Sequence, residues 1–481
     1  MNDKLRIAFI HPDLGIGGAE RLVVDAALGL QGLGHSVDIY TSHHDPQHCF
    51  DETCNGTLRV HHIQSPFPRA YRGKFHILFA HLRQLHLTAH LLRTDASAYD
   101  VFFVDQLSTC VPFLRTYALR RVVFYCHFPD KLLAEGEFAG GTMGRRRGSM
   151  LKRFYRLPMD WLEEKTTDAA DVLLANSHFT AGVFNTYFSI PRKPRVVYPG
   201  INLSAYVPPS DQDNDKNVQE IISDRPTLLS LNRFERKKNI ELALKSFALL
   251  RRSASDFAST QDLRLVLAGG YDPRLQDSIE TLQELINLAS TESLTYFIST
   301  PSSTPPLNLP HSTAPSPRSA SVIFLLNFTT PQRAALLCAH STLALLYTPA
   351  NEHFGIVPVE GMAAGVPVLA CDSGGPTESV RATPLAERTG WLVPPEPRAW
   401  ADTLRDIVGL GELDRAALAN RARARAEAMF GMEAMALGLQ RALIDAVRMG
   451  PLDASTTHYM SDVILAVLIS LLAYFVYRVI A

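Results

Sequence analysis

The sequence has almost no net charge and few cysteines. Its 481 residues include 47 Lys and Arg against 48 Asp and Glu, so the composition gives no electrostatic indication of a nucleic-acid partner. The six cysteines form no Cys-x-x-Cys pair and no zinc-ligand spacing: Cys49, Cys54, Cys110, Cys126, Cys338 and Cys371. This usage argues against a disulfide scaffold and a structural zinc site, and it is typical of reduced thiols in a cytosolic protein.

Long apolar runs are also rare. After a polar start, Ile7–Ile10 is too short for the apolar region of a signal peptide, so we expect the bulk of the chain to stay in the cytosol. The exception is 463–480, 18 residues that are almost wholly apolar. A helix of this length would span roughly 27 Å, about the thickness of a thin bilayer. We therefore expect a transmembrane tail anchor, with a buried core helix as the alternative.

The chain opens with the pattern of a doubly wound nucleotide-binding domain. A strand at Ile7–His11 is followed by a loop that contains Gly17 and Gly18, and then by a helix to about Leu33. Glycine lets the backbone approach a pyrophosphate closely, and a helix N-terminus attracts anions. No Gly-Lys-Ser/Thr follows, which excludes a Walker A loop. An NAD-dependent enzyme is poorly supported, because Gly-x-Gly-x-x-Gly with an acidic residue about 20 positions later is missing.

Two further features of this first domain are candidate parts of a site. The predicted strand Val122–Cys126 ends at His127, and ligands in such folds bind outside the carboxyl ends of the strands. A structural histidine is the alternative reading. A later stretch mixes apolar side chains with five cations: Arg145, Arg146, Arg147, Lys152 and Arg153. Such a mixture suits an anionic membrane surface or a lipid diphosphate, although a solvated loop would have the same composition.

A second domain begins with the predicted strand Thr227–Leu231. We expect domains at 1–200 and 225–450, joined by a polar connection. Arg233 and Lys238 follow the strand, where two cations can converge on a diphosphate. A solvated basic loop is the alternative.

Residues 299–321 interrupt the second domain. They are rich in Ser, Thr and Pro, carry little charge and show no hydrophobic period. This composition predicts a disordered surface insertion.

The central feature of the second domain is a loop between a buried strand and a helix that begins near Pro358. It carries Glu352, and Glu360 follows eight positions later. The N–H groups around Phe354 and Gly355 lie where a helix start can hold a phosphate. Eight residues of continuous helix would place the carboxylates roughly 12 Å apart, whereas a double-displacement glycosidase needs about 5–5.5 Å. Two separate functions for the carboxylates fit this spacing better than one acid–nucleophile pair.

Together these motifs resemble the retaining glycosyltransferases of family 4, which have the GT-B fold and use nucleotide sugars. The resemblance rests on Glu-x7-Glu with His-Phe-Gly, on Gly-Gly-Ala-Glu-Arg after the first strand, and on Arg-x4-Lys. It implies an α/β chain of two Rossmann-like domains that face each other across a cleft. It assigns Glu352 to the donor sugar and Glu360 to the ribose, Arg233 and Lys238 to the diphosphate, and the Gly17–Gly18 loop to the donor. It also places His127 at or beside the sugar.

Three further segments, 127–130, 161–167 and 269–274, resemble a mannosyltransferase of lipid-linked oligosaccharide assembly within that family. This resemblance implies GDP-mannose as donor and a dolichyl-diphosphate-linked Man-GlcNAc2 as acceptor, with α1,3 and α1,6 transfer. It also implies the endoplasmic reticulum membrane, with catalytic domains in the cytosol and other mannosyltransferases of the pathway as partners. No Asp-x-Asp loop marks a metal site, so we expect no metal and no cofactor. The alternatives are a UDP-sugar-dependent transferase and a non-catalytic scaffold for transferases.

Overall fold

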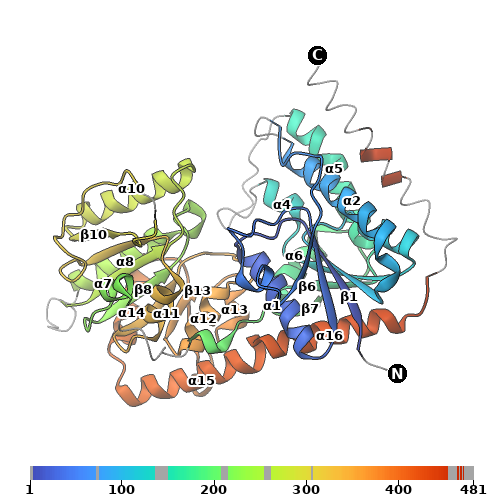
Figure 1. The fold of residues 1–481 in the computed structure, drawn as a ribbon. Coiled ribbons are helices and arrows are strands. Elements are labelled where there is room, and N and C mark those ends of the chain that lie inside the picture. Colours follow the sequence, from blue (N-terminus) through green and yellow to red (C-terminus); the bar gives the residue numbers. More distant parts are fainter. Residues whose placement is uncertain are drawn as a thin grey trace. The chain divides into compact units, whose positions relative to one another are not determined.

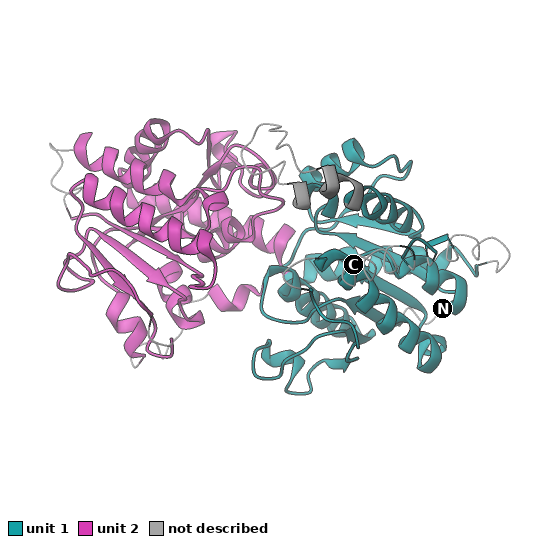
Figure 2. Cartoon of the chain, turned by 90° about the horizontal axis from the view of Figure 1, so that it is seen from above, with its two compact units in different colours: residues 1–138, 142–200, 432–481 teal, residues 139–141, 201–431 magenta. Residues whose placement is uncertain are grey.

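The computed structural model describes residues 4–71, 75–135, 150–206, 215–253, 262–304, 307–452, 463, 464, 466–468 and 470. The chain forms two compact units, which Figure 2 shows in different colours. Unit 1 comprises residues 1–138, 142–200 and 432–481, and unit 2 comprises residues 139–141 and 201–431. Each unit is built around one parallel sheet with helices on its faces, so the predicted α/β class is confirmed.

The sheet of unit 1 has the strand order β3-β2-β1-β4-β5-β6-β7, and all its neighbours are parallel. The chain switches from one half of this sheet to the other between β1 and β4, and such a switch point opens a crevice at the carboxyl ends of the strands. The predicted first strand is β1, and the strand that precedes His127 is β5. The strands are β1 (Arg6–His11), β2 (Ser36–Thr41), β3 (Arg59–His62), β4 (Val101–Asp105), β5 (Arg121–Cys126), β6 (Val172–Ala175) and β7 (Arg195–Val196).

Helices cover both faces of this sheet (Figure 1). Side chains alternate along a strand, so Ile7 and Phe9 of β1 are buried with α1 and α16 while Ala8 and Ile10 are buried with α2 on the other face. The helices of unit 1 are α1 (Gly18–Gly32), α2 (His76–Thr94), α3 (Val111–Phe113), α4 (Asp130–Glu135), α5 (Met150–Asp168), α6 (His178–Tyr187) and α16 (Met432–Arg448).

The last of these helices, α16, belongs to unit 1, whereas the sequence predicts a second domain that extends from 225 to 450 and includes it. After α15 the chain leaves unit 2, and α16 buries Met435 and Leu439 against α1 in unit 1. A Cβ on Gly29 of α1 would lie 2.8 Å from the Cβ of Ala436, so a glycine is needed where the two helices cross closely. The apolar face of α16 predicts a packed helix, but it carries no information about which sheet the helix covers.

The sheet of unit 2 has the order β10-β11-β9-β8-β12-β13-β14, again with parallel neighbours throughout. Its strands are β8 (Thr227–Leu231), β9 (Arg264–Gly269), β10 (Tyr296–Ser299), β11 (Val322–Leu326), β12 (Thr342–Tyr347), β13 (Val368–Cys371) and β14 (Gly390–Val393). Its helices are α7 (Lys216–Ile221), α8 (Ile240–Ser253), α10 (Gln276–Thr291), α11 (Thr330–Cys338), α12 (Ile356–Ala364), α13 (Pro376–Ser379), α14 (Pro397–Val408) and α15 (Glu412–Phe430).

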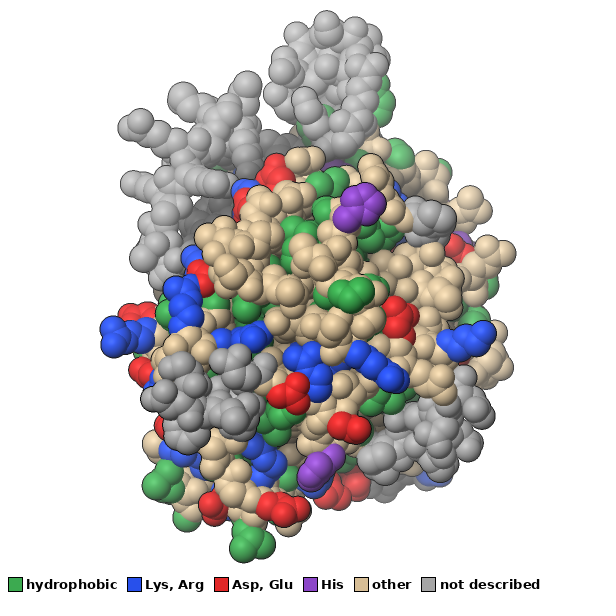
Figure 3. Space-filling model, turned by 90° about the vertical axis from the view of Figure 1, so that its left-hand side faces the viewer, with side chains coloured by type: hydrophobic (Ala, Val, Ile, Leu, Met, Phe, Trp, Pro, Cys, Tyr) green, Lys and Arg blue, Asp and Glu red, His purple; other side chains and the backbone are tan. Residues whose placement is uncertain are grey.

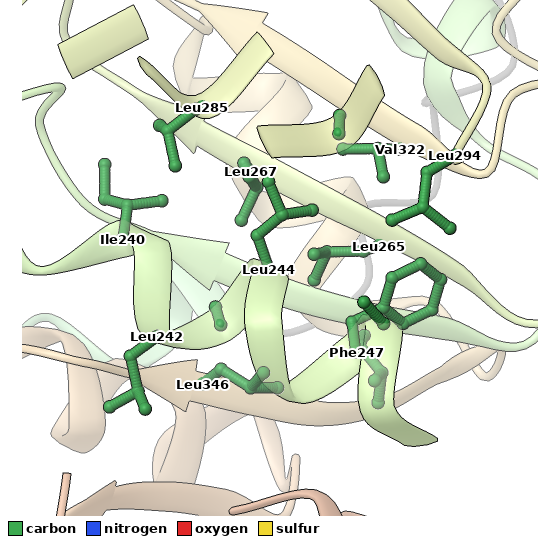
Figure 4. Packing of buried hydrophobic residues seen from close by; sticks show 14 of the residues in the cluster. Ile240, Leu242, Leu244, Phe247, Leu265, Leu267, Leu285, Leu294, Val322 and Leu346 are labelled. Atoms are coloured by element: carbon green, nitrogen blue, oxygen red, sulfur yellow. The ribbon is translucent and has the colours of Figure 1, made fainter. Parts of the chain in front are cut away.

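The core of unit 2 lies between this sheet and the helices α8, α10 and α14. Figure 4 shows Leu244 and Phe247 of α8 beside Leu265 and Leu267 of β9. Each of these four side chains is at most 1% exposed. Fully burying a side chain of this size contributes about 1.5–3 kcal/mol, so the packed sheet is a rigid base for the loops at its carboxyl edge.

The charged side chains on the surface follow the balanced composition. On the face shown in Figure 3, the blue Lys and Arg side chains lie interspersed with the red Asp and Glu side chains. This arrangement agrees with the near-equal totals of 47 and 48. Interspersed charges of opposite sign leave only weak long-range fields.

Part of the insertion predicted at 299–321 is hydrogen-bonded to β10. This edge strand is accompanied by the returning chain: the N–H of Thr313 donates to the carbonyl of Tyr296 at 3.0 Å, and the N–H of Ile298 donates to Ser312 Oγ at 3.0 Å. An edge strand has unpaired N–H and C=O groups, so a segment that forms hydrogen bonds with them is stabilised there. The Ser/Thr/Pro composition of the insertion does not indicate that β10 lies beside it.

No helix among the described residues is long and apolar enough to cross a bilayer. The predicted anchor at 463–480 falls mainly outside the described residues, so it stays a prediction. Its described start is helical, with Ile464 and Leu468 buried in a cluster with Leu78 and Phe79 of α2 and Met159 of α5.

Candidate active site

The loop between β12 and α12 holds the first glutamate. The last strand residue, Tyr347, is followed by Asn351 with φ 53° and by Gly355 with φ 80°. These left-handed conformations turn the chain sharply before α12 begins at Ile356, two residues earlier than predicted. A Cβ on Gly355 would lie 3.1 Å from the ring of Tyr347, so only glycine combines this φ with such a close approach.

The carboxylate of Glu352 is fixed by Lys238, whose Nζ lies 2.5 Å from Glu352 Oε2. Burial raises the pKa of Glu352, but the ammonium of Lys238 outweighs burial and holds this pKa below its ordinary value. Burial raises the pKa of the nearby Tyr347 well above its ordinary value, so the phenol stays protonated. Glu352 is therefore ionised and paired with Lys238.

A second turn braces this loop, and the sequence analysis did not identify it as part of the site. Asn351 N–H donates to Ser373 Oγ at 3.0 Å, and Gly375 N–H donates to the Glu352 carbonyl at 2.7 Å. A Cβ on Gly374 would lie 2.5 Å from the carbonyl oxygen of Glu352. The signal was present in the sequence as a Gly-Gly-Pro turn after a predicted strand, but its contact with Glu352 is a tertiary one.

Glu360 has different partners from Glu352. It lies on the buried face of α12, 6% exposed, where it accepts hydrogen bonds from Tyr206 Oη at 2.7 Å and Arg333 Nη1 at 2.9 Å. Burial raises the pKa of Glu360, although Arg333 and Tyr206 oppose the rise. The two carboxylates are thus held by separate cations, and their separate functions stay a prediction.

The two predicted cations are not equivalent. Lys238 ends a short 3-10 turn, Arg236–Lys238, and its carbonyl accepts a bond from Thr348 Oγ1 at 2.6 Å. Arg233 is 61% exposed, and its guanidinium lies 2.9 Å from Glu235. Unit 2 therefore holds Lys238 against Glu352, whereas Arg233 reaches into solvent and does not contact either glutamate.

In unit 1 the glycine loop leads into α1 as predicted. Gly17 is the N-cap residue, and a Cβ on it would lie 2.2 Å from the carboxylate of Glu20, which folds back over the turn. A Cβ on Gly18 would meet no described heavy atom within 4 Å. The backbone at Gly18 is therefore open on the side to which a Cβ would point.

His127 lies at the carboxyl edge of the unit 1 sheet, in a network that the sequence analysis did not predict. Its Nε2 is 3.0 Å from Asp105 Oδ2, at the end of β4, and Asp105 Oδ1 is 2.8 Å from His11 Nδ1, at the end of β1. Asp105 is 1% exposed and His11 is fully buried. The sequence placed an Asp and two His residues after strands, but only the order β1-β4-β5 brings them together.

The charges of this network are mutually stabilising. Burial raises the pKa of Asp105, but His11 and His127 outweigh it, and this pKa lies below its ordinary value. Burial lowers the pKa of His11, but Asp105 reverses the effect, and this pKa is raised. The Asp105 carboxylate thus accepts a hydrogen bond from His127 Nε2–H, which fixes the ring and leaves Nδ1 as its other polar atom.

The predicted basic stretch is only partly described. Arg145, Arg146 and Arg147 lie outside the described residues. Lys152 and Arg153 belong to α5, and the structure describes their backbone alone.

Comparison with protein families gives two matches that together span most of the chain. The family Glycosyltransferase Family 4 matches residues 16–205, and Glycosyl transferases group 1 matches residues 211–298 and 319–425. The gap between the two parts of the second match falls within the insertion at 299–321.

The fold also resembles solved glycosyltransferases. Sucrose-phosphate synthase from Thermosynechococcus elongatus aligns with a TM-score of 0.66 at 20% identity, over 93% of this chain and 100% of that one. Anabaena HepE in complex with UDP-glucose aligns with a TM-score of 0.62 at 18% identity, over 92% and 100%. These likenesses concern the fold alone, and they confirm GT-B.

Curated relatives are much closer in sequence. The alpha-1,3/1,6-mannosyltransferase ALG2 of Rhizomucor pusillus is 46% identical over 445 residues, which cover 92% of this chain and 92% of that protein. The ALG2 protein of Saccharomyces cerevisiae is 42% identical over 423 residues, or 86% of this chain and 80% of that protein. The chain therefore belongs to the ALG2 family of alpha-1,3/1,6-mannosyltransferases, within the family 4 glycosyltransferases.

Proposed function

We propose that this glycosyltransferase moves mannose from GDP-mannose, with retention, to a dolichyl-diphosphate-linked Man-GlcNAc2 acceptor. It would form one α1,3 and one α1,6 linkage in the synthesis of the N-glycan precursor. Family membership supports the reaction. The observation that carries the mechanism is the ion pair between Glu352 and Lys238 at 2.5 Å, because each partner is poised for a different part of a sugar diphosphate.

In unit 2, the donor would take the place of this internal ion pair. The diphosphate attracts Lys238, and the exposed guanidinium of Arg233 can bind two phosphate oxygens at once. The N–H groups of Phe354 and Gly355 at the start of α12 add further donors. Once Lys238 turns to phosphate, Glu352 is free to accept hydrogen bonds from the mannose hydroxyls. Glu360 would bind the ribose hydroxyls.

The chemical step follows from these positions. The bond from the mannose anomeric carbon to the phosphate oxygen breaks, and a bond to the acceptor hydroxyl oxygen forms on the same face. The acceptor's proton passes to the leaving phosphate. Lys238 and Arg233 stabilise the charge that develops on that phosphate, which is the type of electrostatic assistance that a metal ion supplies in other transferases. We therefore propose a reaction without metal or cofactor.

In unit 1, Gly17 and Gly18 would admit the donor diphosphate to the N-terminus of α1. His127 would hydrogen-bond the sugar, with Asp105 holding its ring in place. The tail at 463–480 would anchor the enzyme in the endoplasmic reticulum membrane with both units in the cytosol. The cations Arg145, Arg146, Arg147, Lys152 and Arg153 would add attraction to anionic lipid, and the other mannosyltransferases of the pathway would be neighbours.

Product analysis tests this proposal. Purified enzyme should convert a short-chain lipid-diphosphate Man-GlcNAc2 acceptor with GDP-mannose into products with one and then two added mannoses, with or without a chelator. Glu352→Gln, which keeps the shape of the side chain but not its charge, should show no transfer. Turnover with UDP-GlcNAc instead would establish a UDP-sugar transferase, and no turnover with either donor would favour the scaffold.

A further inference from the structure

A second group of ionisable side chains lies at the carboxyl edge of the unit 1 sheet, apart from His127. It comprises Asp13 after β1, His43 after β2, His62 at the end of β3, and the arginines Arg69 and Arg83. We call this group the β2–β3 cluster. The function proposed above uses none of these residues.

The cluster is built on a rigid base. Ser42 Oγ donates to the Pro12 carbonyl at 2.7 Å, and Leu14 N–H donates to the His43 carbonyl at 2.8 Å, so the loops after β1 and β2 are joined. Arg83 comes from α2 and is only 7% exposed. A guanidinium that is buried to this degree is held in one position.

Asp13 holds the two arginines together. Arg83 Nη2 lies 2.6 Å from Asp13 Oδ1, and Arg69 Nη2 lies 3.2 Å from Asp13 Oδ2. Arg69 is 57% exposed, whereas Asp13 is 37% exposed. One carboxylate is thus shared by two guanidiniums, and this group of three carries a net positive charge that reaches solvent through Arg69.

His43 reports the same excess of positive charge. Burial lowers the pKa of His43; Arg69, Arg83 and His62 lower it further, and Asp13 opposes them only in part. The rings of His43 and His62 meet edge to face with their centroids 6.4 Å apart. An anion near these rings would reverse the effect, because an opposite charge favours protonated imidazole.

Two neighbouring histidines have other roles. The ring of His61 stacks on Tyr40 at 4.4 Å, and His44 Nε2 lies 3.0 Å from Thr53 Oγ1. His61 and His44 therefore have packing or hydrogen-bond partners of their own, and we do not count them in the β2–β3 cluster with His43 and His62.

The strand order gives the approximate distance between the β2–β3 cluster and His127. From β5, which precedes His127, the sheet passes through β4 and β1 to β2, which precedes His43. Adjacent strands lie about 4.8 Å apart, so these three steps span roughly 14 Å, which is of the order of three linked pyranose rings. The acceptor of the proposed function has three sugars between its reacting end and its diphosphate.

We propose that the β2–β3 cluster binds the diphosphate of the lipid-linked acceptor, while its terminal mannose lies at His127. This inference rests on the proposed function and names a subsite for one of its substrates. The phosphate oxygens would accept hydrogen bonds from Arg69 and from the imidazoles of His43 and His62. The buried guanidinium of Arg83 would contribute a fixed positive charge.

The test uses full-length Arg69→Ala and the double variant Arg69→Ala/His62→Ala. Both residues are exposed, so the fold should be retained, and equal thermal unfolding midpoints would verify this. The matched control is Arg59→Ala, at the opposite end of β3, where a 68% exposed arginine pairs with Asp38. Each enzyme is assayed in neutral detergent with two acceptors, one with the diphosphate and one Man-GlcNAc2 glycoside with an uncharged alkyl group.

We expect Arg69→Ala to raise the KM for the diphosphate acceptor by roughly tenfold or more, since a hydrogen bond to a charged group is lost. The double variant should raise it further. The KM for GDP-mannose, the KM for the uncharged acceptor and all values for Arg59→Ala should stay within about twofold of wild type. Equal losses for both acceptors, or a raised KM for GDP-mannose, would overturn the assignment.

A repeat in vesicles containing anionic phospholipid distinguishes the two sources of phosphate. An effect of Arg69→Ala that appears only in those vesicles would identify a lipid headgroup as the ligand and refute the acceptor subsite. Unchanged KM values in every arm would also refute it. Wild-type transfer from GDP-mannose would in either case leave the proposed function intact.

Discussion

Removing the ammonium of Lys238 should change the pH dependence of the enzyme as well as its rate. In the wild type, burial favours protonation of Glu352 and Lys238 outweighs that effect, so the pKa of Glu352 is below its ordinary value. In Lys238→Ala the burial remains and its main compensation is lost. The pKa of Glu352 should therefore rise above its ordinary value.

The size of the effect follows from the contacts. The Lys238 side chain is 13% exposed and that of Glu352 is 22% exposed, so solvent screens this pair only partly. A raised pKa of Glu352 lowers kcat/KM mainly at acidic pH, where the carboxylate becomes protonated. Loss of the contact to phosphate costs about 1.5–3 kcal/mol, so we expect kcat/KM at neutral pH to fall roughly 10- to 160-fold.

The assay is a profile of kcat/KM against pH with GDP-mannose. The acidic limb reports protonation of Glu352 and should move to higher pH in Lys238→Ala. Lys237→Ala is the matched control, because it removes the same charge from the same turn where the side chain is 56% exposed and pairs with Glu235. An unmoved acidic limb, or an equal shift in Lys237→Ala, would refute the reasoning.

Four further outcomes are expected. Glu360→Ala should raise the KM for GDP-mannose roughly tenfold or more with little change in kcat, since a ribose contact is lost; a selective fall in kcat would contradict the ribose assignment. Asp105→Asn should lower kcat roughly 10- to 100-fold while the KM for GDP-mannose stays near wild type, because the ring of His127 loses its charged partner; unchanged kcat would show that the network is only structural. Glu163 is half-buried and accepts hydrogen bonds from the N–H groups of Asp130 and Lys131 at the start of α4. Loss of solvent around it raises its pKa from 4.5 to about 7, so the folded state retains this proton to higher pH than the unfolded chain. Unfolding stability should then fall as pH rises from about 4.5 to about 7, Glu163→Gln should reduce this slope in urea titrations, and an identical slope would exclude Glu163 as its source. Deletion of 463–481 should release enzyme from membranes and preserve transfer to a short-chain acceptor in detergent; an inactive truncated enzyme would mean that the buried start of this segment is needed for the fold.

Local patterns predicted much of unit 2 because its candidate site residues lie in loops that follow strands. Lys238 comes seven residues after β8, and Glu352 comes five residues after β12. In a parallel sheet, the loops after such strands emerge at the same edge. The order β9-β8-β12 places these two strands side by side, so sequence spacing and spatial contact agree.

The network around Asp105 shows what local patterns omit. Its partner His11 is 94 positions away, and His127 is 22 positions away. Each residue is an unremarkable polar position after a strand, and the contact depends on strand order. The brace from Gly374 and Gly375 and the return of α16 to unit 1 were missed for the same reason, because both are tertiary contacts between segments that appear independent in the sequence.

The return of α16 also sets the order in which a newly made chain can mature. The 231 residues from 201 to 431 leave the ribosome before α16, the helix that packs on one face of the first sheet. At bacterial to eukaryotic rates of about 5–20 residues per second, this interval is roughly 10–50 s. During that time α1 displays the apolar face on which Met435 and Leu439 will pack, and it is a ready binding site for a chaperone. A premature stop just before Met432 would leave that face open permanently, so such products should aggregate or be degraded even though they contain every residue of the proposed donor site in unit 2.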